Sequence, residues 1–383
     1  MNNMTSQVTE ALLLSDAELY QEKLFRMLHS ARSEILLEYY IYADDDFGRQ
    51  LLQTLVTLAN QGVKVKLLVD GFGSELWLKH QLNMLLPLPL EIRVYHPLPW
   101  SLPSLRHALR RSQDFVYCMG TLNRRNHRKL VVVDGQQAII GSHNAWNESL
   151  QWHEASLLLG PSCAQAVQAS FERVWGRSSD LDGQRMRFAL RRDRSSPIPP
   201  AKPEGGQILD NTTLRRSRLR SRTILEPVAH AKARLWITTP YLLPHRTLLR
   251  RIRERAEAGV DVKLLLPARN DVCFSRWIAQ ALYRELLESG VQIHEYTGGI
   301  LHAKVMVMDD AFVLGSSNMN HRSFIQDLEI DSLGRNPAEL QAIVEWTEET
   351  LARCERISNT GQVRLFRLKK CLAFLLNPVK DFF

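Results

Sequence analysis

One set of residue types occurs twice in this chain, in the same order and at almost the same spacing. Each copy begins with a His-x-Lys segment, continues to an aspartate, and ends in a Gly-Ser-x-Asn segment. The first copy consists of His127, Lys129, Asp134, Gly141, Ser142 and Asn144. The second consists of His302, Lys304, Asp309, Gly315, Ser316 and Asn318. A chance match at six such positions is expected about once in 10^8 starting points, so a doubled match indicates shared chemistry.

These residue types suit a phosphate group. A neutral imidazole is a nucleophile towards phosphorus, and lysine, serine and asparagine side chains donate hydrogen bonds to phosphate oxygens. One copy alone could bind an anion and do no more. Two copies that meet could cleave a phosphodiester, because one histidine can attack phosphorus while the other protonates the departing alkoxide. The candidate catalytic residues are His127, Lys129, Asp134, His302, Lys304 and Asp309. The candidate phosphate-binding residues are Ser142, Asn144, Ser316 and Asn318.

The carboxylates near the two copies call for separate interpretations. Asp134 and Asp309 each follow a short apolar strand at a turn, so we interpret them as structural turn residues rather than proton carriers. A carboxylate on the far ring nitrogen would orient each catalytic histidine. Glu154 and Glu329 lie equally far after the histidines of their own copies and are the candidates for this role. The alternative is that they are surface carboxylates at strand ends.

Other chemically suggestive residues have simpler explanations. The three aspartates at 44–46 are expected to cap the following helix rather than bind a cation. The glycine-containing segment 71–74 lacks the lysine of a phosphate-binding P-loop. His143 and His153 are explained equally well as ordinary polar positions. The sequence contains none of the usual metal-ligand clusters, so we predict neither a metal nor another cofactor.

The elements around the two motifs repeat as well. In the first half, a predicted strand at 33–41 is followed by a helix at 51–60 and a strand at 62–70. The second half repeats this order at 234–241, 247–258 and 259–266. Each motif then contributes two short strands joined by a tight turn, and alternation along the first strand places His and Lys on one face. We therefore predict an α/β protein of two similar α/β/α sandwich lobes with mainly parallel mixed sheets, related by a pseudo-two-fold axis, with the active site at their interface.

Composition suggests where the lobes begin and end. We expect a first lobe at 1–180, a basic Pro-rich linker at 181–216, a second lobe at 217–356 and a basic amphipathic tail at 357–383. The first half also carries an insert at 96–126, rich in arginine and apolar residues, which we interpret as a lid or membrane-contact element. The tail is either an interfacial helix or a helix packed on the protein's own core.

Bulk properties limit the class of protein. The chain has 383 residues, of which 45% are hydrophobic and 23% charged, as in ordinary globular proteins. Neither a membrane-spanning apolar stretch nor a secretory signal is recognisable, and five scattered cysteines fit a reducing compartment. The net charge of +8 favours a polyanionic partner, either nucleic acid or an anionic membrane.

The doubled motif resembles that of the phospholipase D superfamily, and the resemblance extends over about residues 15–375. Residues 38–41, 46–48, 70–74 and 315–324 resemble the bacterial cardiolipin synthases, and the lack of N-terminal transmembrane helices resembles their B-type branch. The resemblance implies transfer of a phosphatidyl group from phosphatidylglycerol, through a phosphohistidine, to the hydroxyl of a second lipid, with release of glycerol. It also implies that His127 is the nucleophile and His302 the general acid, a choice that the residues themselves leave open.

The first copy departs from this pattern after Asn144. It continues Ala-Trp-Asn-Glu-Ser-Leu, whereas the second copy continues Met-Asn-His-Arg-Ser-Phe. Counted from the motif asparagine, the first copy also reaches its glutamate one residue sooner than the second copy does. The assignment of Glu154 therefore depends on less of the motif than that of Glu329.

Three functions remain to be distinguished. The leading hypothesis is a phosphatidyltransferase that makes cardiolipin from phosphatidylglycerol, bound peripherally at the cytoplasmic face of the bacterial inner membrane, without a nucleic-acid partner. The second is a phospholipase D-type hydrolase or a metal-independent nuclease or phosphodiesterase, for which the positive charge is the argument. The third is a non-catalytic module that keeps the motif as an anion clamp. The sequence leaves the oligomeric state open.

Overall fold

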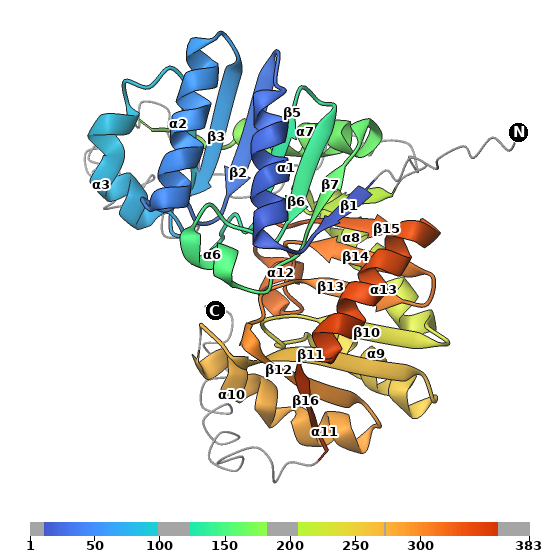
Figure 1. The fold of residues 1–383 in the computed structure, drawn as a ribbon. Coiled ribbons are helices and arrows are strands. Elements are labelled where there is room, and N and C mark those ends of the chain that lie inside the picture. The colour runs from blue at the N-terminus through green and yellow to red at the C-terminus, as the bar shows by residue number, and fades with distance from the viewer. Residues whose placement is uncertain (1–10, 99–122, 182–205, 272, 359–383) are drawn as a thin grey trace, which may run out of the picture.

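The protein consists of two lobes, each built on an eight-stranded sheet (Figure 1). A computed structural model describes residues 11–98, 123–181, 206–271 and 273–358. The strands of the first sheet run in the order β1-β7-β6-β5-β2-β3-β4-β8, and those of the second in the order β16-β12-β11-β10-β13-β14-β15-β9.

The first lobe contains the following elements. Its strands are β1 (Ala11–Leu14), β2 (Glu34–Tyr39), β3 (Lys64–Asp70), β4 (Glu91–Tyr95), β5 (Leu130–Val133), β6 (Gln137–Gly141), β7 (Ser156–Leu159) and β8 (Ser179–Asp180). Its helices are α1 (Ala17–His29), α2 (Asp46–Asn60), α3 (Glu75–Leu85), α6 (Asn147–Gln151) and α7 (Pro161–Trp175).

The second lobe repeats this plan. Its strands are β9 (Gln207–Asp210), β10 (Arg234–Thr238), β11 (Asp261–Arg269), β12 (Gln292–Ile300), β13 (Val305–Met308), β14 (Ala311–Gly315), β15 (Ile330–Gly334) and β16 (Cys354–Ile357). Its helices are α8 (Leu214–His230), α9 (Arg246–Glu257), α10 (Cys273–Ala281), α11 (Tyr283–Glu288), α12 (His321–Ile325) and α13 (Pro337–Leu351).

The predicted pair of similar α/β lobes is confirmed, with one correction to the sheets. Among the strands that the structure describes, parallel pairing is confined to β2-β3-β4 and β10-β11-β12, whose connections contain helices. The motif strands pair antiparallel, β5 with β6 and β13 with β14, because a tight turn joins each pair. The sheets are therefore mixed, and antiparallel pairs are more numerous than parallel ones.

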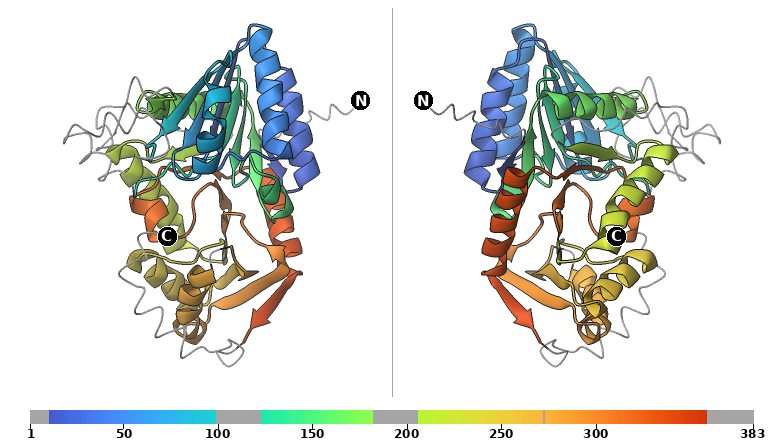
Figure 2. Two further views of the ribbon diagram at one scale, coloured as in Figure 1. Left: turned by 90° about the vertical axis from the view of Figure 1, so that its left-hand side faces the viewer. Right: turned by 90° about the vertical axis from the view of Figure 1, so that its right-hand side faces the viewer.

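The two lobes share an apolar core. Val132 of β5 and Ile140 of β6 belong to the same buried cluster as Val305 of β13 and Leu314 of β14. α7 packs on its own sheet and also contacts β9, while α13 packs on the second sheet and also contacts β1. Figure 2 shows the two lobes stacked one above the other. This common core sets the relative position of the two motifs.

The structure also corrects one predicted boundary. Residues 207–210, which composition placed in the linker, form β9, which pairs with β15, and α8 begins at Leu214. Most of the predicted insert (99–122), the centre of the linker (182–205) and the tail from 359 lie outside the described residues. None of the helices in the described ranges is both long and apolar enough to span a bilayer.

Candidate active site

Each motif histidine is held at the junction of the lobes by backbone from the opposite lobe. The N–H of His127 donates to the carbonyl of Leu328 at 3.0 Å, and the N–H of His302 donates to the carbonyl of His153 at 2.9 Å. Each of these carbonyls belongs to the residue directly before a candidate glutamate. The histidine of one lobe is therefore brought next to the carboxylate of the other.

The histidine–glutamate pairs are crossed between the lobes. Nδ1 of His127 lies 3.2 Å from Oε1 of Glu329, and 3.1 Å from the carbonyl oxygen of Ser316. Nδ1 of His302 lies 2.7 Å from Oε1 of Glu154. Both carboxylates are fully buried. Each of the two candidate glutamates therefore lies next to the histidine of the other copy.

The two carboxylates differ in their electrostatics. Burial disfavours ionisation of Glu154, but the charge and hydrogen bond of His302, with the charges of Lys304 and His143, outweigh it and hold the pKa at about 2. Burial raises the pKa of Glu329, which is only partly offset by Lys129 and hydrogen bonds from two serines. His302 therefore faces the more firmly ionised partner.

Burial also lowers the pKa values of both histidines. That of His127 lies well below its usual value, because the ring is buried and the charges of Lys129 and Lys304 oppose a proton on it. That of His302 is lowered by burial and by Lys304, while Glu154 opposes the shift. The neutral imidazole is thus strongly favoured at His127.

The two lysines are buried beside their histidines. Nζ of Lys129 donates to the carbonyl of His127 at 2.6 Å. Nζ of Lys304 donates to the carbonyl of His302 and lies 2.9 Å from Nε2 of the same residue. Burial and the charge of Lys304 lower the pKa of Lys129 to about 7, and burial lowers that of Lys304 to about 8. Each ammonium is therefore poorly solvated and would gain from a nearby anion.

The predicted phosphate-binding role requires a correction for the two serines. Ser142 Oγ exchanges hydrogen bonds with the backbone of Ala155 at 3.0 Å, and Ser316 Oγ donates to Glu329 and accepts from the N–H of Ile330. Both serines are fully buried. They join β6 to β7 and β14 to β15, so their role is structural.

The two asparagines, by contrast, line the cavity that also contains both histidines. Asn144 Oδ1 accepts from the N–H of Ile41 at 3.1 Å, which fixes the side chain. The Oδ1 atom of Asn318 is buried and has no hydrogen-bond partner among the residues that the structure describes. Both amides are placed to meet a polar ligand in this cavity.

The glycine of each motif permits a close approach of two strands. A Cβ atom on Gly141 would collide with the Cα of Ser156, and one on Gly315 would collide with the Cα of Asp331 and the carbonyl of Ile330. Only glycine fits at the position where the second motif strand pairs this closely with its neighbour in the sheet. This contact positions the asparagine that follows.

Asp134 and Asp309 lie away from the cavity and act as turn residues. Asp134 accepts from the backbone N–H groups of residues 32, 33 and 34 at 2.8 Å, and Asp309 accepts from those of residues 232, 233 and 234 at 2.8–3.0 Å. Both residues have positive φ angles, 51° and 47°. Each therefore ties the end of a motif hairpin to the start of β2 or β10, which favours the structural interpretation over a catalytic role.

The cavity between the lobes has a volume of about 800 Å³. Aromatic rings flank its histidines: Tyr40 lies 5.0 Å from His127, while Trp152 and Tyr241 lie 5.0 Å and 6.4 Å from His302. None of these three aromatic residues was recognised from the sequence. Tyr40 lies in the segment 38–41 that carries the family resemblance, and Tyr241 lies at the end of a predicted strand, but neither observation assigns a role in the site.

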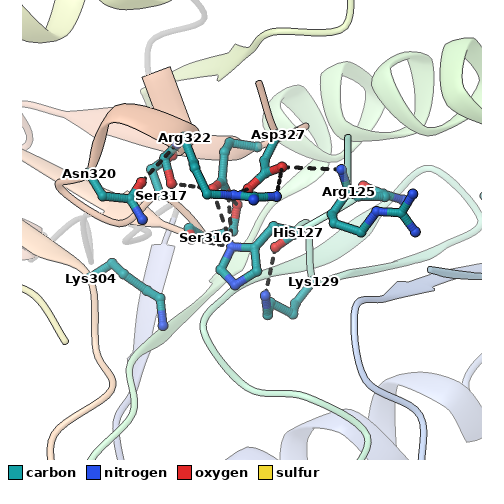
Figure 3. A network of polar contacts seen from close by, with 12 residues as sticks. Arg125, His127, Lys129, Lys304, Ser316, Ser317, Asn320, Arg322 and Asp327 are labelled. Carbon is teal, nitrogen blue, oxygen red and sulfur yellow. Dashed lines mark hydrogen bonds and ion pairs between the residues drawn. The ribbon is translucent and has the colours of Figure 1, made fainter. Parts of the chain in front are cut away.

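A polar network next to His127 was also missed (Figure 3). Arg322 donates to both oxygens of Asp327, at 3.0 Å and 2.9 Å, and to Oδ1 of Asn123 in the first lobe at 2.7 Å. The N–H of Arg125 donates to Oδ1 of Asp327 at 3.1 Å. All four residues line the cavity, so this network joins the lobes at the wall of the site.

The other residues weighed from the sequence are structural. His143 stacks on Tyr20 at 4.0 Å, and His153 stacks between Tyr296 and Trp346. Asp45 caps α2 through the N–H of Gly48, as predicted for the aspartates at 44–46. Among the residues that the structure describes, no group of three or more His, Cys, Asp or Glu side chains could hold a metal ion.

Each of the two α/β lobes contributes one motif histidine, His127 or His302, to a shared cavity. This fold is similar to that of phosphatidylserine synthase from Haemophilus influenzae, with a TM-score of 0.74 and 14% identity, over 98% of this chain and 94% of that one. The family model described as "Cardiolipin synthase, PLD-like domain" matches residues 24–175 and 224–351. The chain belongs to this family.

Curated relatives carry the same family name. A cardiolipin synthase of Halalkalibacterium halodurans is 30% identical over 86% of this chain, which spans 64% of that protein. A cardiolipin synthase of Clostridium perfringens is 29% identical over 93% of this chain and 73% of its own length. The chain thus spans slightly less than two thirds of the first of these relatives.

Proposed function

We propose that the protein is a phosphatidyltransferase that makes cardiolipin from phosphatidylglycerol, with a phosphohistidine as the intermediate and glycerol as the leaving group. The observation that carries this proposal is the crossed arrangement of the two histidines, each held by a carboxylate of the other lobe in one cavity. The similarity to proteins named cardiolipin synthase supports the choice of substrate.

In this proposal His127 is the nucleophile. Its Nδ1 is engaged by Glu329 and Ser316, so Nε2 carries the lone pair that attacks phosphorus. The strongly lowered pKa keeps the imidazole neutral, as a nucleophile requires. The new bond joins Nε2 to phosphorus, and the bond between phosphorus and the glycerol oxygen breaks.

His302 serves as general acid in the first step and general base in the second. Its Nδ1 is bound to the ionised Glu154, which stabilises an imidazolium that carries its second proton on Nε2. The proton passes to the departing glycerol oxygen. The hydroxyl of a second phosphatidylglycerol then returns a proton to His302, attacks phosphorus and releases His127.

The charge of the phosphoryl group is balanced by Lys129 and Lys304, with Asn144 and Asn318 as further donors. Both ammonium groups are buried, and an anion between them would raise their lowered pKa values. Donors already in place as charge develops stabilise the transition state without reorganisation. In the same proposal the protein acts peripherally at the cytoplasmic face of the bacterial inner membrane, where its anionic substrate is found.

The test is turnover of phosphatidylglycerol vesicles by the purified protein in EDTA, with the lipid products resolved. Cardiolipin and free glycerol, both lost in His127→Ala and kept in a matched His29→Ala control on the exposed end of α1, are the expected result. Phosphatidic acid alone would contradict the transferase and favour the hydrolase. Absence of lipid turnover together with EDTA-resistant cleavage of DNA would favour the nuclease instead.

A further inference from the structure

Exposed large apolar side chains are concentrated on and around α3. Among the described residues, six large apolar side chains are exposed, and four of them lie on or directly beside this helix. They are Phe72, Leu76, Met84 and Leu86, with exposed fractions of 57%, 68%, 68% and 48%. With the exposed Lys79, we call these residues the α3 outer face.

The exposed apolar side chains of α3 are different from those that pack the helix on the first lobe. Trp77, Leu78 and Leu85 are buried on that side and attach the helix to the first lobe. A helix that lies on the surface of a water-soluble protein normally presents charged and polar side chains to the solvent. On the solvent side of α3, Leu76 and Met84 are exposed beside the polar Lys79, His80 and Asn83, so this side combines apolar with polar side chains, as a helix at a membrane interface does.

The position of this face relates it to the proposed active site. Phe72 lines the same cavity as His127 and His302, and α3 begins at Glu75, directly after the turn that contains Phe72. Phe72 therefore places one member of the α3 outer face on the wall of the cavity. Figure 1 shows α3 at the edge of the first lobe opposite β1.

We propose that the α3 outer face contacts the interfacial region of an anionic lipid bilayer and brings the cavity to its substrate. Leucine, methionine and phenylalanine side chains would enter the acyl boundary, and Lys79 would meet anionic headgroups. This rests on the proposed function, because a substrate embedded in a bilayer is the reason for the cavity to meet a membrane. The sequence suggested this role for the insert and the tail, most of whose residues lie outside the described ranges.

The proposal is tested by flotation of the purified protein with phosphatidylglycerol-containing vesicles. The double variant Leu76→Ser/Met84→Ser should partition about tenfold more weakly, since two exposed apolar side chains lose their burial. The matched control is Leu12→Ser, which alters an exposed leucine on β1, at the opposite edge of the lobe. Lys79→Gln should reduce binding at low salt and leave binding at high salt unchanged.

A second readout separates this proposal from the proposed function. Turnover of monomeric short-chain phosphatidylglycerol should be unchanged in the double variant, while turnover in vesicles should fall with partitioning. Partitioning of the double variant within twofold of wild type would overturn the proposal, as would a wild-type protein that does not partition. A dimer in solution that Leu76→Ser dissociates would identify this face as a contact between copies instead. If neither lipid is turned over but partitioning falls as expected, the proposed function fails and the α3 contact stands.

Discussion

Glu154 of the first lobe lies 2.7 Å from Nδ1 of His302 in the second lobe, and Glu329 of the second lobe lies 3.2 Å from Nδ1 of His127 in the first. Each lobe therefore contains half of two different histidine–carboxylate pairs. Neither lobe can orient its own histidine. The docking of the two lobes is thus a condition for the proposed chemistry.

The crossed pairing predicts different consequences for the two glutamates. Glu154→Gln removes the charge that supports His302 as general acid, so turnover of phosphatidylglycerol should fall about 10²–10³-fold. A phosphodiester of p-nitrophenol needs no proton on its leaving group, so the first burst of p-nitrophenol, which reports the first step alone, should come within tenfold of wild type in Glu154→Gln. Glu329→Gln disturbs the nucleophile His127 and should impair both substrates. If Glu329→Gln impaired only phosphatidylglycerol turnover and Glu154→Gln impaired both substrates, these roles would be refuted.

Lys129 predicts an alkaline limit to activity. Its pKa of about 7 means that the free enzyme loses this positive charge as the pH rises through 7 to 8, so kcat/KM should fall over that range. Lys129→Arg keeps a charge that does not titrate, and the decline should move to higher pH even if activity is lower. Lys66→Arg, at a buried lysine paired with Glu172 outside the cavity, is the matched control. An unchanged alkaline limb in Lys129→Arg would exclude Lys129 as its source.

Asp134 is predicted to contribute to stability and not to chemistry. Asn tolerates the positive φ but cannot accept the hydrogen bond from the Arg32 N–H as a carboxylate does, so Asp134→Asn should lower the free energy of unfolding by about 1 kcal/mol. The pKa of Asp134 is about 2 in the fold, below its usual value near 4. This stabilisation is therefore present above pH 4 and is lost as the pH falls from 4 to 2.

Denaturant unfolding at pH 7 and at pH 2 measures this effect. The loss in Asp134→Asn should be present at pH 7 and small at pH 2, while turnover per folded molecule stays within twofold of wild type. The exposed Asp46→Asn serves as the control. A loss of turnover of a hundredfold without a loss of stability would show that Asp134 acts in catalysis.

Gly315→Ala should destabilise the second lobe by about 1–3 kcal/mol, because the added Cβ collides with the backbone of β15. At Gly176 the nearest atom to an added Cβ is 3.5 Å away, so Gly176→Ala should be close to neutral and provides the control. Thermal unfolding of both variants tests this prediction. Equal melting temperatures for the two would mean that β14 and β15 can separate without cost.

The sequence by itself determined the local part of this protein. The doubled motif, the repeated strand–helix–strand order and the turn aspartates depend on residues near one another in the chain, where spacing and periodicity carry the information. The same reasoning identified Glu154 and Glu329 by their equal offsets. This reasoning overestimated the share of parallel strand pairs. It inferred parallel pairing from the helical connections and gave too little weight to the motif hairpins, whose strands must pair antiparallel.

Only the tertiary structure decided how the two halves meet. Spacing along the chain does not predict which glutamate lies next to which histidine, because that pairing depends on the apolar core shared by β5, β6, β13 and β14. The same packing buried Ser142 and Ser316 against neighbouring strands and left Asn144 and Asn318 in the cavity. Tyr40, Trp152 and Arg322 became part of the site through contacts between segments far apart in the chain, which are set by long-range packing.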